Sequence, residues 1–136
     1  HSKGTVGALI VDRGDASEAP HALGCDIQRK TVKMARLSHK FLNESEQKFV
    51  DQFPPEEQLT LLHLIWNAKE SLYKAYGLKE LDFRRNILVQ PFEWDGMQGR
   101  GAGYIEKGAF RQSFRLIYSQ LILPDEEALF YAIAVA

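Results

Sequence analysis

The segment from Trp66 to Gly77 carries an acid and a base at a spacing that suits chemistry. Its residues are WNAKESLYKAYG. Projected at about 100° per residue, Glu70 and Lys74 lie one helical turn apart on a polar flank, beside an apolar stripe. Such a pair can serve proton transfer and the binding of charged groups. It can equally form an ordinary ion pair on a solvated helix.

The same projection places three further polar residues. His63 and Asn67 fall on the polar flank, whereas Lys69 falls inside the apolar stripe. A cation on an apolar face must extend to solvent, form an ion pair or contact a ligand. Lys69 is therefore either a structural lysine or a candidate for phosphate or proton handling.

A second short motif lies upstream of this segment. Residues 22–27 are predicted to form a buried strand, and Gly24 is followed in it by the isolated carboxylate Asp26. Cys25, between them, is the only cysteine of the chain, which excludes an internal disulfide framework. On a buried strand this thiol is expected to be an inert core residue.

The ordered pair of motifs, Gly-x-Asp and Trp-x-x-Lys-Glu-x-x-x-Lys-x-x-Gly, resembles the 4'-phosphopantetheinyl transferase superfamily. Residues 41–46, FLNESE, are similar to the family's entry into the helix between the motifs, and residues 1–4, HSKG, are similar to the block that opens the second half of its two-half members. The resemblance indicates the C-terminal half of a two-half, surfactin-synthetase-activating type enzyme.

The resemblance implies an activity of the holo-[acyl-carrier-protein] synthase type. The 4'-phosphopantetheine arm of coenzyme A would pass to a serine hydroxyl of an acyl or peptidyl carrier protein, with Mg²⁺ bound and 3',5'-ADP released. In the family the coenzyme lies between two halves or between subunits. An N-terminal half or another subunit is therefore expected to complete the cleft.

The resemblance also implies roles for individual residues. Asp26 and Glu70 would bind the metal ion, and Glu70 would also accept the serine proton. Lys74 and His1 would contact the phosphates of coenzyme A. Lys69 is the third candidate catalytic residue, beside Glu70 and Lys74.

Gln28 departs from the family pattern, because many two-half members have a second carboxylate there. We expect Gln28 to be a neutral metal ligand that weakens binding, since Mg²⁺ also accepts carbonyl or water oxygens. One alternative is a catalytically weakened module of the same fold that binds carrier proteins or coenzyme A. Another is an unrelated α+β binding protein, with Glu70 and Lys74 as surface decoration.

Composition and charge limit the kinds of partner and the number of domains that the chain can have. The 136 residues are 45% hydrophobic, and the formal net charge is -1. One domain with a real core is expected, and nothing favours nucleic acid or a membrane surface as partner. No apolar run approaches the roughly 18 residues of a membrane span, so a cytoplasmic location is expected. The cationic residues 29–40 are a candidate docking surface for an acidic carrier protein.

The pattern of elements predicts an α+β fold for a single domain, residues 1–136. We expect strands at 5–11, 22–27, 87–94, 103–106, 114–123 and 128–136. Asn43 and Glu46 have capping-box spacing for a helix over 44–52, and a long helix should follow and end at Gly77. The glycine-rich residues 96–103 lack the ending of a phosphate-binding loop, so we predict a flexible hairpin tip. Together these elements predict an antiparallel sheet packed against a long helix and shorter helices.

Overall fold

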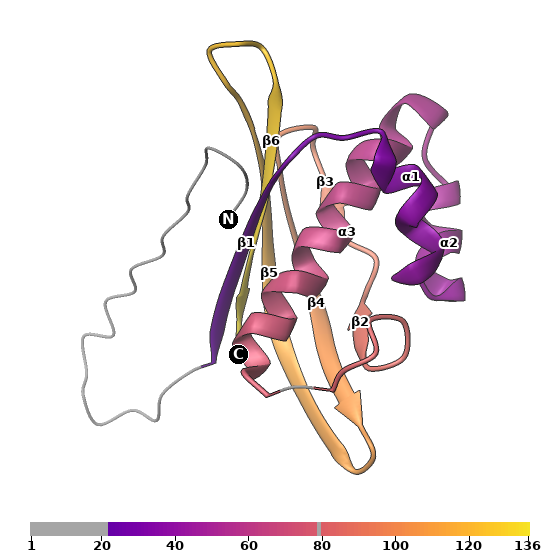
Figure 1. The fold of residues 1–136 in the computed structure, drawn as a ribbon, viewed down its shortest axis with the longest axis vertical. Coiled ribbons are helices and arrows are strands. Elements are labelled where there is room, and N and C mark those ends of the chain that lie inside the picture. The colour runs from indigo at the N-terminus through magenta and orange to yellow at the C-terminus, as the bar shows by residue number, and fades with distance from the viewer. Residues whose placement is uncertain (1–21, 79) are drawn as a thin grey trace, which may run out of the picture.

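The described chain forms one antiparallel sheet with helices against it (Figure 1). The computed structural model describes residues 22–78 and 80–136. In chain order the elements are β1 (Leu23–Arg29), α1 (Lys33–Leu37), the short 3-10 helix η1 (Ser38–Lys40), α2 (Glu44–Asp51), α3 (Pro55–Tyr76), β2 (Ile87–Val89), β3 (Glu93–Trp94), β4 (Gln98–Lys107), β5 (Phe110–Ile122) and β6 (Ala128–Val135). The predicted α+β fold is confirmed.

The sheet has the order β1-β6-β5-β4-β2, and β3 pairs with β4. The first and last described strands therefore lie side by side, with Asp26 opposite Ala132. Because side chains alternate along a strand, Gly24, Asp26 and Gln28 share one face of β1. The strand predicted at residues 5–11 lies outside the described residues.

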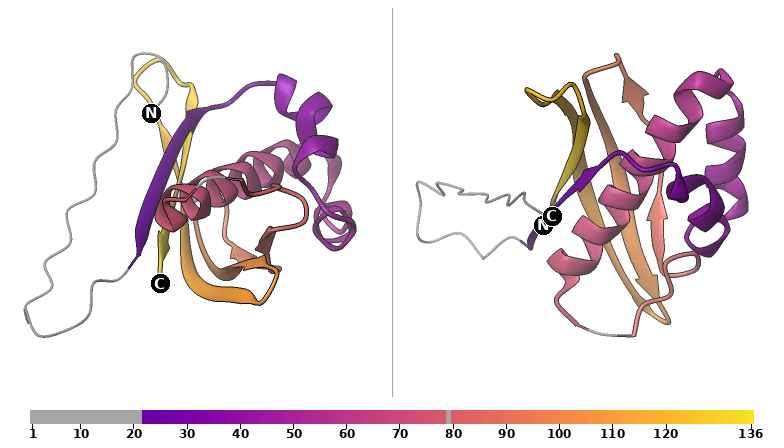
Figure 2. Two further views of the ribbon diagram at one scale, coloured as in Figure 1. Left: turned by 60° about the horizontal axis from the view of Figure 1, so that its bottom comes forward. Right: turned by 45° about the horizontal axis from the view of Figure 1, so that its top comes forward.

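Helix α3 crosses this same face of the sheet, and α1 and α2 pack against it (Figure 2). It begins at Pro55, a residue whose fixed φ suits the first helical position. It ends at Gly77, which takes the left-handed conformation at φ 73° and donates its N–H to Tyr73 O. The end predicted at Gly77 is confirmed, and the helix that carries Glu70 and Lys74 is continuous.

The hydrophobic core fills the space between α3 and the sheet. Its fully buried members include Leu61, Leu64, Ile65 and Leu72 from α3 and Phe130 from β6. Within the ranges 22–78 and 80–136, no helix is long and apolar enough to cross a membrane.

Helix α2 is held at its start by the predicted capping box. Asn43 Oδ1 accepts the Glu46 N–H at 2.8 Å, and Glu46 Oε1 accepts the Asn43 N–H at 2.9 Å. Glu46 is nevertheless buried, and its Oε2 also accepts the N–H of Val89 on β2 at 2.8 Å. The capping residue thus also ties α2 to the sheet.

The prediction of a flexible tip at residues 96–103 is wrong for most of that run. Gly99 and the glycines after it lie in β4, and Gly96, at φ 101°, belongs to the turn before the strand. A side chain at Gly99 would place its Cβ 2.2 Å from Glu93 O. The missing side chain permits a close backbone contact with β3. The strand predicted at 87–94 is likewise divided into β2 and β3.

Candidate active site

The contact between β1 and α3 depends on Gly24. A Cβ at this position would lie 2.0 Å from Ser71 O and 2.8 Å from Ala75 N, both backbone atoms of α3. Any larger residue would push the strand from the helix. The glycine of the Gly-x-Asp motif therefore brings β1 close enough to α3 for side chains of the two elements to meet.

Asp26 meets Lys74 across this contact. Lys74 Nζ donates to Asp26 Oδ1 at 2.9 Å and to Cys25 O at 3.2 Å. The Asp26 side chain is 8% exposed and the Lys74 side chain is 42% exposed. Burial raises the pKa of the Asp26 carboxyl, although the hydrogen bond from Lys74 opposes that shift.

The second carboxylate oxygen of Asp26 does not take part in the contact with Lys74. Oδ2 is buried and has no hydrogen-bond partner among the described residues. A buried acceptor without a donor is costly, since burial removes its water and supplies nothing in return. The site therefore has a polar atom available to a ligand.

Glu70 lies one turn before Lys74 on α3 and is partly buried. Burial raises the pKa of its carboxyl, and the negative charge of Asp26 raises it further, while Lys74 lowers it. The charge of Asp26 thus acts on the Glu70 carboxyl although the two residues are far apart in sequence. Repulsion between two such acids is relieved by a proton or a cation.

Three predicted site residues remain, namely Gln28, His1 and Lys69. Gln28 is partly buried, on the same face of β1 as Asp26. His1 lies outside the described residues. Lys69 is fully buried and donates to Phe41 O and Phe83 O, each at 2.6 Å.

Lys69 also forms a buried ion pair with Glu46 Oε1 at 2.7 Å. All three ammonium donors are therefore engaged by protein acceptors. Burial lowers the pKa of Lys69, and the charge of Glu46 opposes this shift. The arrangement favours the structural alternative for Lys69, which therefore has no part in the function proposed below.

The prediction that His63 and Asn67 lie on an open polar flank is wrong, because β1, β6 and the chain after β1 cover that side of α3. Both residues are fully buried. His63 Nε2 accepts the Thr31 N–H at 2.9 Å, and its Nδ1 lies 2.8 Å from Leu59 O. These contacts require a neutral ring with the proton on Nδ1, and burial lowers its pKa.

Two buried polar residues of α3 contact the sheet: Asn67, which the helical projection placed on the polar flank, and Ser71, which it did not single out. Asn67 Nδ2 donates to Phe130 O at 2.8 Å and lies 3.5 Å from Asp26 O. The Ser71 hydroxyl lies 3.0 Å from Ala132 O. Their spacing of one helical turn was the available signal, since it places both on the side of Glu70 and Lys74.

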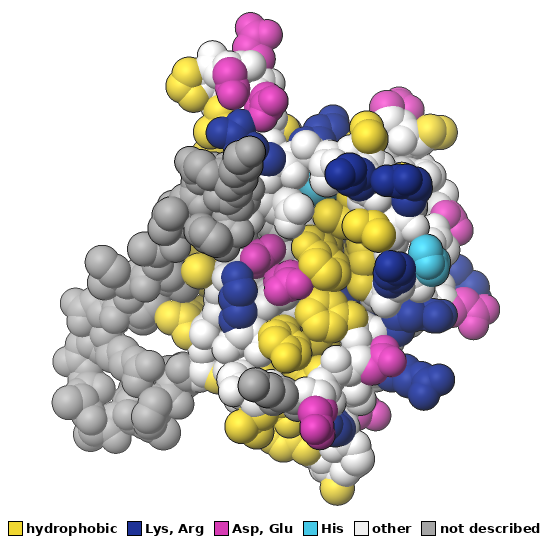
Figure 3. Space-filling model, in the orientation of Figure 1, with side chains coloured by type: hydrophobic (Ala, Val, Ile, Leu, Met, Phe, Trp, Pro, Cys, Tyr) yellow, Lys and Arg dark blue, Asp and Glu magenta, His cyan; other side chains and the backbone are white. Residues whose placement is uncertain are grey.

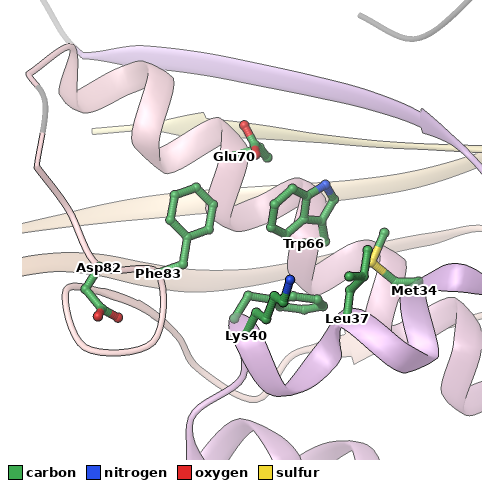
Figure 4. A pocket seen from close by; sticks show the side chains of 8 residues that line it. Met34, Leu37, Lys40, Trp66, Glu70, Asp82 and Phe83 are labelled. Carbon is green, nitrogen blue, oxygen red and sulfur yellow. The ribbon is translucent and has the colours of Figure 1, made fainter.

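An apolar groove of about 460 Å³ opens beside Glu70. In Figure 4, Trp66 and Phe83 lie between Glu70 and Lys40, and Met34 and Leu37 close the side formed by α1. The groove therefore joins the acidic site to the cationic residues 29–40.

The surface around α1 combines positive charge with exposed apolar side chains. Lys33, Arg36 and Lys40 are exposed, and so are Val32 (78%) and Leu37 (42%). Figure 3 shows Lys and Arg side chains gathered beside the central hydrophobic surface. This mixture suits an acidic protein partner with an apolar contact.

The donors fit a hard cation only in part. In the part of the chain that the structure describes, no group of three His, Cys, Asp or Glu side chains is placed to hold a metal ion. Mg²⁺ does not need one, because it typically uses one or two carboxylates together with water and substrate phosphates. Asp26 and Glu70 provide that number of carboxylates, and Asp26 Oδ2 is the free acceptor.

Comparison with models of protein families gives a match. The family model of the 4'-phosphopantetheinyl transferase superfamily matches residues 22–132. This range spans most of the chain and includes β1, the whole of α3 and the residues that line the groove beside Glu70. A comparison with curated proteins finds no match.

Proposed function

Since the chain belongs to the 4'-phosphopantetheinyl transferase superfamily, we propose that it transfers the 4'-phosphopantetheine arm of coenzyme A to a serine of an acyl or peptidyl carrier protein, as a holo-[acyl-carrier-protein] synthase. The superfamily acts on carrier proteins with coenzyme A as substrate. Membership excludes an unrelated α+β binding protein. The active site proposed for this chain is Asp26, Glu70 and Lys74.

The reaction sets the demands on the site. The serine oxygen forms a bond to the phosphorus that carries the pantetheine arm, and the bond from that phosphorus to 3',5'-ADP breaks. The serine proton must leave, and the pyrophosphate charge must be neutralised as the leaving group departs. The site therefore needs cationic groups, a proton acceptor and room for both substrates.

Asp26 and Glu70 are the residues that would hold Mg²⁺, and Gln28 is a further oxygen donor on the same face of β1. The unpartnered Asp26 Oδ2 and the raised pKa values of both carboxyls support this assignment. When bound, the ion would neutralise phosphate charge. A neutral amide at Gln28 leaves the site with two carboxylates, which suits a metal ion that binds together with its substrate.

Glu70 is the proposed proton acceptor. A carboxyl with a raised pKa holds a proton better than an ordinary glutamate, so it is better matched to accepting one near neutral pH. The groove that Glu70 lines is wide enough for a substrate group to approach it.

Lys74 is the proposed phosphate contact. Its ammonium already lies at the mouth of the β1–α3 contact and is 42% exposed, so it can reach a ligand while remaining near Asp26. A point charge at this place would stabilise the pyrophosphate. His1, on the matched position of the resembling block, remains a proposed second contact.

Residues 29–40 are the proposed docking surface for the carrier protein. Met34, Leu37 and Lys40 of this segment line the groove that Glu70 also lines, so a partner bound there would have its serine near Glu70. We further propose that the chain, residues 1–136, acts as one domain, the C-terminal half of a two-half enzyme, and that an N-terminal half or another subunit completes the coenzyme cleft. A cytoplasmic location remains a prediction.

One observation favours the second candidate function, a weakened binding module. Gln28 is neutral, whereas many two-half members carry a second carboxylate at this position, two residues after the aspartate. A module of this kind would bind coenzyme A or the carrier protein without transferring the arm at a useful rate.

The ion pair that joins Asp26 of β1 to Lys74 of α3, one helical turn after Glu70, is the observation that carries the proposal. The test incubates the full-length protein with Mg²⁺, coenzyme A and a panel of carrier proteins without the arm. A gain in carrier mass equal to the phosphopantetheinyl group, matched by 3',5'-ADP release, is expected, and EDTA should abolish it. Binding of coenzyme A or carrier without any transfer would favour the binding module.

A further inference from the structure

Asn67 lies at the seam between the two strands that α3 crosses. Phe130 of β6, which is paired with Gln28 of β1, provides the carbonyl that accepts its 2.8 Å hydrogen bond. The second, longer contact, at 3.5 Å, is to the carbonyl of Asp26 itself. One buried amide group thus contacts both strands.

These contacts fix the orientation of the amide. Nδ2 faces two carbonyl oxygens, and the reverse orientation would set oxygen against oxygen. Oδ1 therefore points the other way, and it is buried without a partner among the described residues. Asp26 Oδ2 is in the same condition, so two neighbouring residues each have an acceptor without a donor.

Asn67 precedes Glu70 by three residues and Lys74 by seven, so all three belong to one side of the helix. Its bonds therefore fix the register of α3 against β1 at the level where the acidic site is built. Ser71, one turn on, has its hydroxyl 2.7 Å from Asn67 O within α3 and 3.0 Å from Ala132 O of β6. Of the two side chains, Asn67 is the one with a hydrogen-bond contact to the strand that carries Asp26.

We infer that Asn67 is a positioning residue for the metal-binding carboxylates, because its buried amide holds the main chain of Asp26 against the helix that carries Glu70 and Lys74. It does not itself touch substrate. Loss of the amide allows the strand and helix to shift, and the carboxylates no longer present oxygens to a shared cation. This inference rests on the proposed function, since it assumes that Asp26 and Glu70 bind a divalent cation.

The test measures binding of Mn²⁺, a spectroscopic substitute for Mg²⁺, with coenzyme A present and no carrier protein, so no turnover occurs. Outer groups that orient metal ligands typically contribute about 10- to 100-fold to affinity. Asn67→Ala should therefore weaken Mn²⁺ binding at least about tenfold. Ser71→Ala, the control, removes a buried polar group one turn away whose hydroxyl contacts Asn67 O and Ala132 O but makes no hydrogen bond to β1, and it should change the affinity by less than about threefold.

Three outcomes separate the possibilities. No Mn²⁺ binding by the wild-type protein would contradict the proposed metal site itself. Wild-type binding with equal losses in Asn67→Ala and Ser71→Ala would overturn the positioning role, since both variants would then act through general stability. A selective loss in Asn67→Ala supports it.

A measurement on the wild-type protein decides the case if Asn67→Ala does not fold. In ¹⁵N-labelled protein, the side-chain amide signal of Asn67 should shift during Mg²⁺ titration with the midpoint of metal binding. Other buried amide groups remote from Asp26 should not shift. An unchanged Asn67 signal at saturating Mg²⁺ would overturn the inference.

Discussion

The Lys74 ammonium lies 2.9 Å from Asp26 Oδ1, while the other oxygen of the same carboxylate, Oδ2, is buried without a partner in residues 22–78 and 80–136. One oxygen is thus paired with a cation of the protein, and the other remains available to a ligand. The same pair joins β1 to α3.

The two carboxylates should be indispensable for transfer. Asp26→Asn and Glu70→Gln preserve shape but remove charge, so each should lower the transfer rate at least about a hundredfold. Initial rates with saturating coenzyme A and Mg²⁺ measure the effect. Glu44→Gln, at an exposed acid of α2, is the control and should be near normal. Near-normal rates in either site variant would contradict the assignment.

Lys74 should act through its charge on the phosphates. Lys74→Ala should weaken coenzyme A binding, measured by titration calorimetry on the full-length protein, or lower turnover. Lys74→Arg should restore only part of the loss, since a planar fork does not reproduce a point charge beside Asp26. Unchanged binding together with unchanged turnover in Lys74→Ala would remove Lys74 from the site.

Glu70 should reduce the stability of the metal-free protein at neutral pH. Its pKa is raised by burial and by Asp26, so the folded state binds more protons than the unfolded state between the two pKa values. Stability is then lost as pH rises through the folded pKa. Metal-free Glu70→Gln should therefore unfold at higher urea concentration than wild type at pH 7, and the difference should disappear near pH 4.

Addition of Mg²⁺ should make the wild-type protein more stable to urea than Glu70→Gln at pH 7. A ligand that binds only the folded state stabilises it, so Mg²⁺ with coenzyme A should raise the wild-type midpoint and leave Glu70→Gln nearly unchanged. A Glu70→Gln variant that is less stable than wild type at pH 7 without metal would show that Glu70 is structural.

Lys69 should behave as a structural residue. Lys69→Met leaves Glu46 charged and buried without its partner, a loss that typically costs about 3 to 5 kcal/mol. Urea unfolding measures the free energy of unfolding, with Lys74→Met as the matched comparison at a partly exposed lysine. Normal stability with lost turnover in Lys69→Met would return Lys69 to the catalytic residues.

The surface of α1 should steer the carrier protein. Lys33→Glu with Arg36→Glu should slow carrier association and flatten its dependence on salt, with coenzyme A binding unchanged. Arg111→Glu with Arg115→Glu makes the same change in net charge on β5 and should have little effect. Equal behaviour of the two pairs in stopped-flow association at low salt would place the docking surface elsewhere.

Local rules were sufficient to predict the parts of the fold that depend on neighbours in sequence. The capping box of Asn43 and Glu46 and the end of α3 at Gly77 involve residues within a turn of each other, and both are confirmed. The glycines of β4 were misjudged, because the atoms that require them, such as Glu93 O beside Gly99, belong to another strand.

The same limit applies to the site. Motif order brought Asp26, Glu70 and Lys74 into one hypothesis, and the structure pairs Asp26 with Lys74 across the β1–α3 contact, one helical turn after Glu70. Helical projection could not show that β1 and β6 cover the flank that bears Asn67. It also could not reveal Glu46, from α2, as the partner of Lys69.

Side chains of α3 bind main-chain atoms near both ends of the candidate docking segment, residues 29–40. His63 takes the N–H of Thr31, and Lys69 donates to the carbonyl of Phe41. Side chains between these anchors, apart from the buried Met34, can be exchanged without loosening either end. If the proposed roles hold, substitutions in this segment would change the preference for a carrier protein while β1 and α3 keep the Asp26–Lys74 pair.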